Sequence, residues 1–145
     1  MNFEQMSEML QQVIVKAVTL CKEKSHPMID TIHMLKVLFE QDTLDGLFKR
    51  LNIDKKLDLR MIDEDLKNVV SSNGGEPRFS NEVIKSFEEA RKWSDEQEET
   101  YLGCASLWIA LMFNKSYIAK RLVKTFNLKE KTCKEEELKR RGGKA

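Results

Sequence analysis

The chain has 145 residues, 41% of them hydrophobic and 34% charged, a length at which one compact domain is expected. Its 25 lysines and arginines nearly cancel its 24 aspartates and glutamates, and the net charge of +1 argues against a nucleic-acid or membrane-surface binder, which would carry a basic excess. Two prolines and six glycines are too few for a turn-rich all-β protein and favour amphipathic helices with charged outer faces.

The first half of the sequence predicts four helices. Ser7 is a good helix cap because apolar residues with helical spacing follow it, namely Leu10, Ile14, Ala17 and Cys21. Pro27 ends this helix, since the residue before a proline avoids the helical conformation. A second helix is expected to start near Thr31, and two more follow it. The polar, glycine-containing residues 71–79 are predicted to be a loop.

The second half of the sequence repeats the first. An offset of 73 residues aligns Ser80 with Ser7, and past an insertion of two residues the segment 126–128 aligns with 51–53. Because either half alone would leave an apolar face exposed, we predict an all-α fold in which two tandem, pseudo-symmetric four-helix repeats form one eight-helix domain. The predicted boundaries are residues 1–141 for the domain, 3–70 and 80–141 for its repeats, and 142–145 for the start of a linker.

The motifs of nucleotide and metal chemistry are missing from the sequence. There is no G-x-x-x-x-G-K-S/T loop to bind phosphate, so we expect this chain neither to bind nor to hydrolyse ATP, and to be no enzyme. His26 and His33 have only distant cysteines as further ligands and do not provide the four ligands of a zinc site. We therefore expect no metal, and we expect His33 to form a hydrogen bond in the first turn of the second helix.

The three cysteines are an odd number and widely spaced, which is typical of a reducing cytosol. Cys21 lies on an apolar stripe and is expected to be buried, Cys104 is expected to be a small residue at a helix start, and Cys133 is expected to be half exposed. None has the nearby base of an activated nucleophile. The sequence shows no secretory leader and no apolar run long enough to span a membrane, so a cytoplasmic location is expected.

The aromatic residues of the second half allow two interpretations. Trp93 lies about 80° from the centre of the apolar stripe of its helix, at about 100° per residue, so we expect it at the edge of the core. Trp108, Tyr101 and Phe113 are close to it in sequence. Either these side chains fill the interface between the repeats, or they line a shallow apolar groove that accepts a peptide.

The two tandem repeats resemble the Clp N-terminal domain family, on the strength of the segment Met28 to Leu38 and its counterpart Tyr101 to Leu111 at the second helix of each repeat. Residues 2–5 and the Arg-Gly-Gly of 141–143 are similar to the ClpB branch in particular. The resemblance implies the substrate-engaging N-terminal domain of an ATP-dependent protein disaggregase, which binds unfolded or aggregated polypeptides through a shallow apolar groove. An adaptor- or substrate-docking domain of a ClpC- or ClpA-type protease regulator is the alternative.

The resemblance also implies the setting in which the chain works. The parent protein would bind ATP and magnesium, whereas this chain would hold no cofactor. The parent would be a homohexamer that cooperates with the DnaK chaperone system, with no nucleic acid and no membrane among its partners.

Six residues are candidates for substrate binding by the same resemblance. The family's first-helix hydroxyl matches Ser7, and an acidic residue before the Tyr-Leu step of the second repeat matches Glu99. The sequence departs from the family where a further acidic residue falls on Ala105 and an apolar groove residue falls on Ser106. With the better-matched apolar positions included, the candidates are Ser7, Phe87, Trp93, Glu99, Ala105 and Ser106; no catalytic or metal-binding residue is implied.

Overall fold

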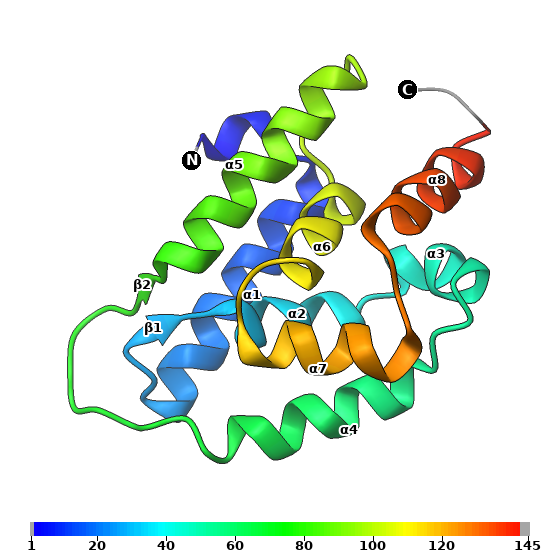
Figure 1. The fold of residues 1–145 in the computed structure, drawn as a ribbon. Coiled ribbons are helices and arrows are strands. Elements are labelled where there is room, and N and C mark those ends of the chain that lie inside the picture. Colours follow the sequence, from blue (N-terminus) through cyan, green and yellow to red (C-terminus); the bar gives the residue numbers. More distant parts are fainter. Residues whose placement is uncertain (1, 143–145) are drawn as a thin grey trace.

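The computed structural model of the chain describes residues 2–142, which form eight α-helices, two short 3-10 helices and two short strands (Figure 1). The helices are α1 (Glu8–Lys24), α2 (Thr31–Glu40), α3 (Asp45–Arg50), α4 (Lys55–Leu66), α5 (Asn81–Glu96), α6 (Cys104–Met112), α7 (Tyr117–Phe126) and α8 (Glu130–Arg140). The 3-10 helices are η1 (Phe3–Gln5) and η2 (Asp42–Leu44), and the strands are β1 (Met28–Ile29) and β2 (Arg78–Phe79). The predicted all-α fold with two four-helix repeats is confirmed.

Equivalent residues cap the first helix of each repeat. The Ser7 hydroxyl accepts a hydrogen bond from the Leu10 N–H at 3.2 Å, and the Ser80 hydroxyl accepts one from the Val83 N–H at the same distance. Each bond satisfies a backbone donor that the first turn of a helix leaves free. The sequence offset of 73 residues therefore corresponds to a structural equivalence at the start of both repeats.

The repeat also extends to the helix ends. Four residues other than glycine have a positive φ between residues 2 and 142, and they form two equivalent pairs. Ser25 (φ 55°) follows α1 as Glu98 (φ 58°) follows the end of α5, at the offset of 73 residues. Asn52 (φ 56°) and Asn127 (φ 51°) follow α3 and α7 at the offset of 75 residues that the insertion creates. A left-handed residue is a common helix terminator, so each repeat ends these helices in the same way.

Short backbone pairings cross from one repeat to the other. β1 lies parallel to β2, with Ile29 paired to Phe79 at the end of the segment predicted as a loop. The equivalent pair is the isolated bridge between Met6 and Leu102. The Ser80 N–H donates to the Ile29 carbonyl at 3.0 Å, and the Ser7 N–H donates to the Leu102 carbonyl at 2.9 Å. Each repeat thus pairs the segment before its first helix with the segment before the second helix of the other repeat.

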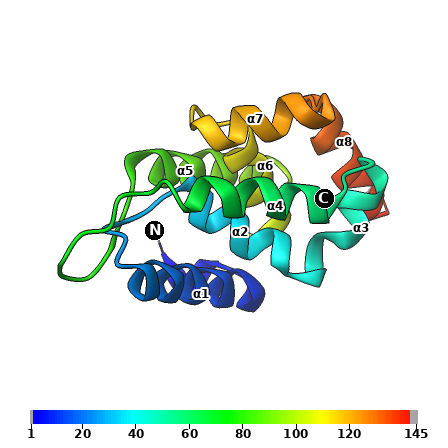
Figure 2. The ribbon, with the colours of Figure 1, turned by 90° about the horizontal axis from the view of Figure 1, so that it is seen from below.

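The centre of the molecule is formed by α2 and α6, the two helices that bury most of their residues. Figure 2 shows α1 along one edge of the molecule and α7 along the opposite edge. Trp108 of α6 is fully buried and lies edge-on to Phe39, with 6.0 Å between ring centres, and 5.2 Å from the Phe48 ring. Trp108 therefore fills the interface between the repeats, whereas Tyr101 is 58% exposed and lies outside it.

The last helix packs differently from the prediction. Cys133 has no exposed surface, so the expectation that it is half exposed is wrong. Glu137 is also completely buried, and it is neutralised by Arg140 and Arg141, whose Nε atoms each lie 2.6 Å from its carboxylate. An ion pair takes the place of the apolar contacts that α8 lacks. Of the predicted linker, residues 143–145 lie outside the described part of the chain.

Candidate functional site

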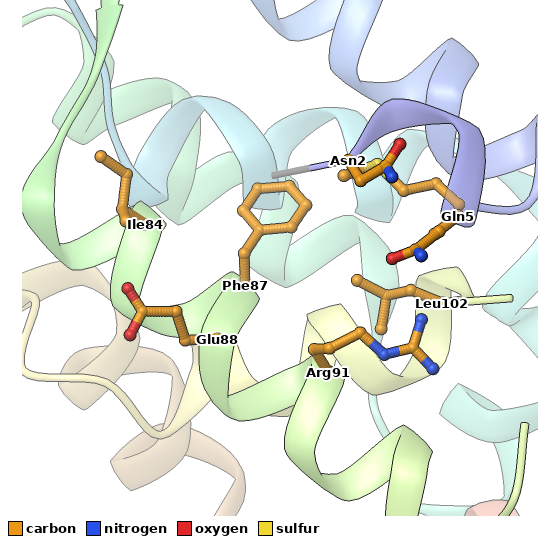
Figure 3. A pocket seen from close by; sticks show the side chains of 8 residues that line it. Asn2, Gln5, Ile84, Phe87, Glu88, Arg91 and Leu102 are labelled. Atoms are coloured by element: carbon orange, nitrogen blue, oxygen red, sulfur yellow. The ribbon is translucent and has the colours of Figure 1, made fainter.

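A hollow with a volume of about 350 Å³, here called the Phe87 hollow, lies between α5 and the start of the chain (Figure 3). It is lined by Asn2, Gln5, Met6, Ile84, Phe87, Glu88, Arg91 and Leu102. Figure 3 shows the Phe87 ring between Ile84 and Leu102. The crossed backbone pairing of Met6 with Leu102 forms one side of the hollow, and a single face of α5 forms the other.

The Phe87 hollow has an apolar floor and a polar rim. Met6, Phe87 and Leu102 are almost completely buried, whereas Ile84 is 38% exposed on the wall. On the rim, the Arg91 guanidinium donates to the Asp95 carboxylate at 3.0 Å and to the Glu99 carbonyl at 2.9 Å, which fixes its position. A mostly apolar hollow with a few polar groups at its edge can hold an apolar side chain of a peptide.

A second hollow of about 330 Å³, here called the Trp93 hollow, lies on the other side of α5, against α6 and the start of α8. Its apolar wall is made by Ala90, Trp93, Ile109 and Phe113, and charged side chains of α5 and α8 surround it. Trp93 is only 8% exposed, and its ring lies 5.4 Å from the Lys134 ammonium and 5.6 Å from the Arg141 guanidinium. Cations over the ring hold the indole in place.

Ser106 is a lining residue of the Trp93 hollow whose hydroxyl is buried. This residue is 2% exposed, and its hydroxyl has no hydrogen-bond partner among residues 2–142. The resemblance expects an apolar groove residue at this position, and the serine leaves a buried polar group there instead.

The six candidates from the sequence do not form one site. Trp93 and Ser106 line one hollow and Phe87 lines the other, with α5 between them. The other three line neither hollow: Ser7 caps α1, Ala105 is buried in α6, and Glu99 is engaged within the fold. The Glu99 carboxylate accepts a hydrogen bond from Ser94 at 3.3 Å and pairs with Arg141 at 2.8 Å.

Of the residues that line the Phe87 hollow, sequence reasoning identified only Phe87. Ile84 precedes Phe87 by three residues on α5, so helical periodicity could have placed it on the same face. Met6 carries no such signal, because it reaches the hollow through a one-residue backbone bridge to Leu102. A pairing this short leaves no alternating pattern in the sequence.

The thiols of the chain are held in their inert form. Burial raises the pKa of Cys21 and Cys133 to about 12 and that of Cys104 to about 11. Within the described residues, no three side chains of the histidine, cysteine, aspartate and glutamate types are placed to share a metal ion. Over the same part of the chain, no helix has the length and apolar character needed to cross a membrane.

We expect all three cysteines to react slowly with Ellman's reagent in the folded protein. The thiolate fraction falls about tenfold for each unit by which the pKa rises, so at pH 8 the native thiols should react more slowly than in urea, about a hundredfold for Cys104 and about a thousandfold for Cys21 and Cys133. Absorbance at 412 nm follows the reaction, and the same protein in 8 M urea is the control. One thiol that reacts as fast folded as unfolded would contradict the burial of that cysteine.

Comparison with known proteins agrees with the fold. A family model described as the Clp repeat (R) N-terminal domain matches residues 5–126. The chaperone protein ClpB of Bacteroides thetaiotaomicron is 22% identical over 121 residues, which cover 82% of this chain and 14% of that protein. The chain thus spans about 14% of the length of the curated relatives that it matches.

Two solved structures share the fold. The Hsp104 N-terminal domain from Candida albicans has a TM-score of 0.82 and 21% identity, over 95% of this chain and 92% of that one. A ClpV N-domain in complex with a VipB peptide has a TM-score of 0.74 and 17% identity, over 94% of this chain and 86% of that one.

Proposed function

Since this chain belongs to the Clp repeat N-terminal domain family, a non-catalytic domain of AAA+ proteins, we propose that it captures polypeptides for a longer ATP-driven protein. The proposed role is that of the N-terminal domain of a ClpB-type disaggregase, which engages unfolded or aggregated chains. The observation that carries the proposal is the Phe87 hollow, with its apolar floor and the partly exposed Ile84.

The geometry of the Phe87 hollow suits weak and unselective binding. A domain that binds many unfolded chains needs apolar contact without a polar pocket that fits only one ligand. Burying one large apolar side chain is worth about 1.5–3 kcal/mol, so one anchor gives low affinity. The side-chain amides of Asn2 and Gln5 at the rim are suited to hydrogen bonds with the backbone of an extended peptide.

The remaining features of this function belong to the longer protein. We propose that the parent binds ATP and magnesium, assembles as a homohexamer and works with the DnaK system in the cytoplasm. The support is the likeness to a ClpB chaperone of which this chain spans 14%. ATP hydrolysis would then take place outside this domain.

Docking of a folded adaptor, as in a ClpC- or ClpA-type regulator, is the second candidate. The ClpV N-domain of the same fold was solved with a VipB peptide, so this fold has bound a peptide from a defined partner. A defined partner would place several side chains at once and could use the Trp93 hollow, whose charged surroundings favour polar contacts.

Ile84→Ser should weaken binding of an unfolded polypeptide about three- to tenfold, because it removes apolar contact from the Phe87 hollow. The side chain is partly exposed, so the melting temperature should stay close to that of the wild type. Val15→Ser is the matched control, since Val15 is 56% exposed on α1 and does not line this hollow. NMR shift titration with a reduced and alkylated protein as ligand measures the affinity and maps the contact.

Two outcomes would separate the candidates. Unchanged binding by Ile84→Ser, with shifts confined to other surfaces, would exclude the Phe87 hollow as the capture site. Binding to a folded adaptor but to no unfolded protein would replace capture by adaptor docking.

A further inference from the structure

Two buried histidines form a hydrogen bond at the corner between α1 and α2. His26 is 5% exposed and follows the left-handed residue that ends α1, whereas His33 is 1% exposed and lies in the first turn of α2. The Nδ1 atom of His26 lies 2.8 Å from the Nε2 atom of His33. At this distance the two nitrogens share one proton.

The hydrogen bonds fix the proton positions on both rings. The Nδ1 atom of His33 accepts the Asp30 N–H at 3.0 Å, which completes a capping box at the start of α2. This nitrogen therefore carries no proton, and the proton of His33 is on Nε2, from which it is donated to Nδ1 of His26. His26 in turn carries its own proton on Nε2. Both rings are neutral, and each is protonated on Nε2 alone.

An additional proton has no place in this arrangement. On Nδ1 of His26, it would point directly at the N–H of His33. On Nδ1 of His33, it would displace the Asp30 N–H from the helix cap. Protonation of either ring therefore breaks one of the two hydrogen bonds of the pair.

The histidine pair is linked to the second repeat. The Asp30 carboxylate accepts the Thr31 N–H at 2.8 Å and the Ser80 hydroxyl at 2.9 Å, so the start of α2 is bonded to the cap of α5. Next to it, β1 pairs with β2. If this corner loses its hydrogen bonds, the N-terminal part of α5, where the Phe87 hollow begins, loses the contacts that hold it in place.

Few charged groups act on the pair. Lys24 at the end of α1 and Asp30 before α2 are the charges beside it, and the Cys21 thiol of α1, which donates to the Met28 carbonyl, is the other titratable group. From α5 the corner receives the uncharged Ser80 hydroxyl. Burial is the main cause that lowers the pKa of both histidines, and that of His33 falls to about 4.

We propose that the hydrogen bond between His26 and His33 is an acid-sensitive lock, which holds the corner of the first repeat against the start of α5 and opens when either ring gains a proton. The lock is specific to the first repeat. At the offset of 73 residues, the second repeat has Glu99 and Ser106 in place of the two histidines. This inference stands on the corner geometry and holds whether or not the proposed function is right.

The direction of the pH effect follows from the two states. In the locked form the pKa of both histidines is below the ordinary value of 6.5, and that of His33 is about 4. Both rings regain the ordinary pKa when the corner opens. The open form therefore binds more protons between about pH 4 and 6.5, and opening becomes easier as the pH falls through this range. One histidine released at pH 5.5 changes the opening equilibrium about tenfold relative to neutral pH.

Amide hydrogen exchange tests the lock directly. After correction for the intrinsic pH dependence of exchange, protection of the His26, Asp30 and Ser80 amides should fall about tenfold between pH 7.5 and 5.5. The Ser7 amide, the counterpart of Ser80 in the other crossed pairing, is the internal control and should not change. A long-range ¹H–¹⁵N NMR spectrum at pH 7 should show both rings protonated on Nε2 alone.

His33→Gln is the matched variant. Glutamine is a regular capping-box residue that can accept the Asp30 N–H but does not titrate in this range. Protection in this variant should lose the part of the acid response that His33 contributes, and only the response of His26 should remain between pH 7.5 and 5.5. The proposal is overturned if the wild-type rings titrate near pH 6.5 with the corner still protected, or if the variant keeps the full acid response of the wild type. If His33→Gln does not fold, the ring tautomers and the amide exchange of the wild-type protein still test the proposal.

Discussion

Glu137→Ala should lower the free energy of unfolding by about 3 kcal/mol, the low end of the range for breaking a buried ion pair. The Glu137 carboxylate is 1% exposed and accepts three hydrogen bonds, two from Arg140 at 2.6 and 2.8 Å and one from Arg141 at 2.6 Å. Alanine would leave both guanidinium groups without this partner. Because they are 33% and 18% exposed, water can compensate part of the loss.

Urea unfolding followed by circular dichroism measures this effect. Glu130→Ala is the matched control on the same helix, since its partner Lys134 lies at 3.2 Å and the Glu130 side chain is 52% exposed, a surface pair worth at most about 1 kcal/mol. Arg140→Ala should lie between the two, because Arg141 still neutralises the carboxylate. If Glu137→Ala were as mild as Glu130→Ala, α8 would not depend on the ion pair.

Asp58→Leu should have the opposite effect and stabilise the protein by about 1–3 kcal/mol at pH 7. Asp58 in α4 is completely buried, and neither carboxylate oxygen has a hydrogen-bond partner in residues 2–142. Burial, with a smaller effect of Asp54, raises the pKa of Asp58 to about 8. The side chain is therefore largely protonated at neutral pH, and a leucine of similar size avoids burying a polar group without a partner.

The pH dependence of stability identifies Asp58 as the cause. Its folded pKa lies above its unfolded value, so its contribution to stability is present at low pH and is lost as the pH rises from about 4 to about 8. Asp58→Asn should remove this loss, so it should match the wild type near pH 4 and gain stability over it as the pH rises, although its amide is still unpartnered. Asp58→Leu should remove the loss and also add stability near pH 4. An unchanged slope between pH 4 and 8 in both variants would show that another group causes it.

Helical periodicity predicted most of the fold because it is a signal carried by many residues. The apolar stripe after Ser7 and its counterpart after Ser80 predicted two helices and their caps. The segments 51–53 and 126–128, aligned as repeat equivalents, contain the left-handed residues Asn52 and Asn127. These features depend on residues close in sequence. The burial of Cys21 follows from the first stripe.

The rest depends on contacts that periodicity does not encode. Glu137 was missed because α8 has few apolar residues, although arginines three and four residues later are a recognisable sign of pairing along a helix. The arrangement of the candidate site could not be predicted for a different reason. The six candidates were chosen one by one, and only the three-dimensional structure shows that Phe87 and Trp93 line different hollows beside α5 and that Glu99 pairs with Arg141.

The crossed backbone pairings bear on how such a chain can have arisen. One copy of the repeat carries two pairing segments, one before its first helix and one before its second, but in this fold each segment pairs only with the other copy. The smallest assembly that satisfies both segments of a single copy is a two-fold symmetric homodimer, in which the same surface serves both subunits. Gene duplication and fusion of such a dimer would produce the present chain, with the segment between α4 and β2 as the join. Once joined, the two halves no longer had to stay identical. The first repeat could then evolve the pair of His26 and His33, and the second repeat the pair of Glu99 and Arg141.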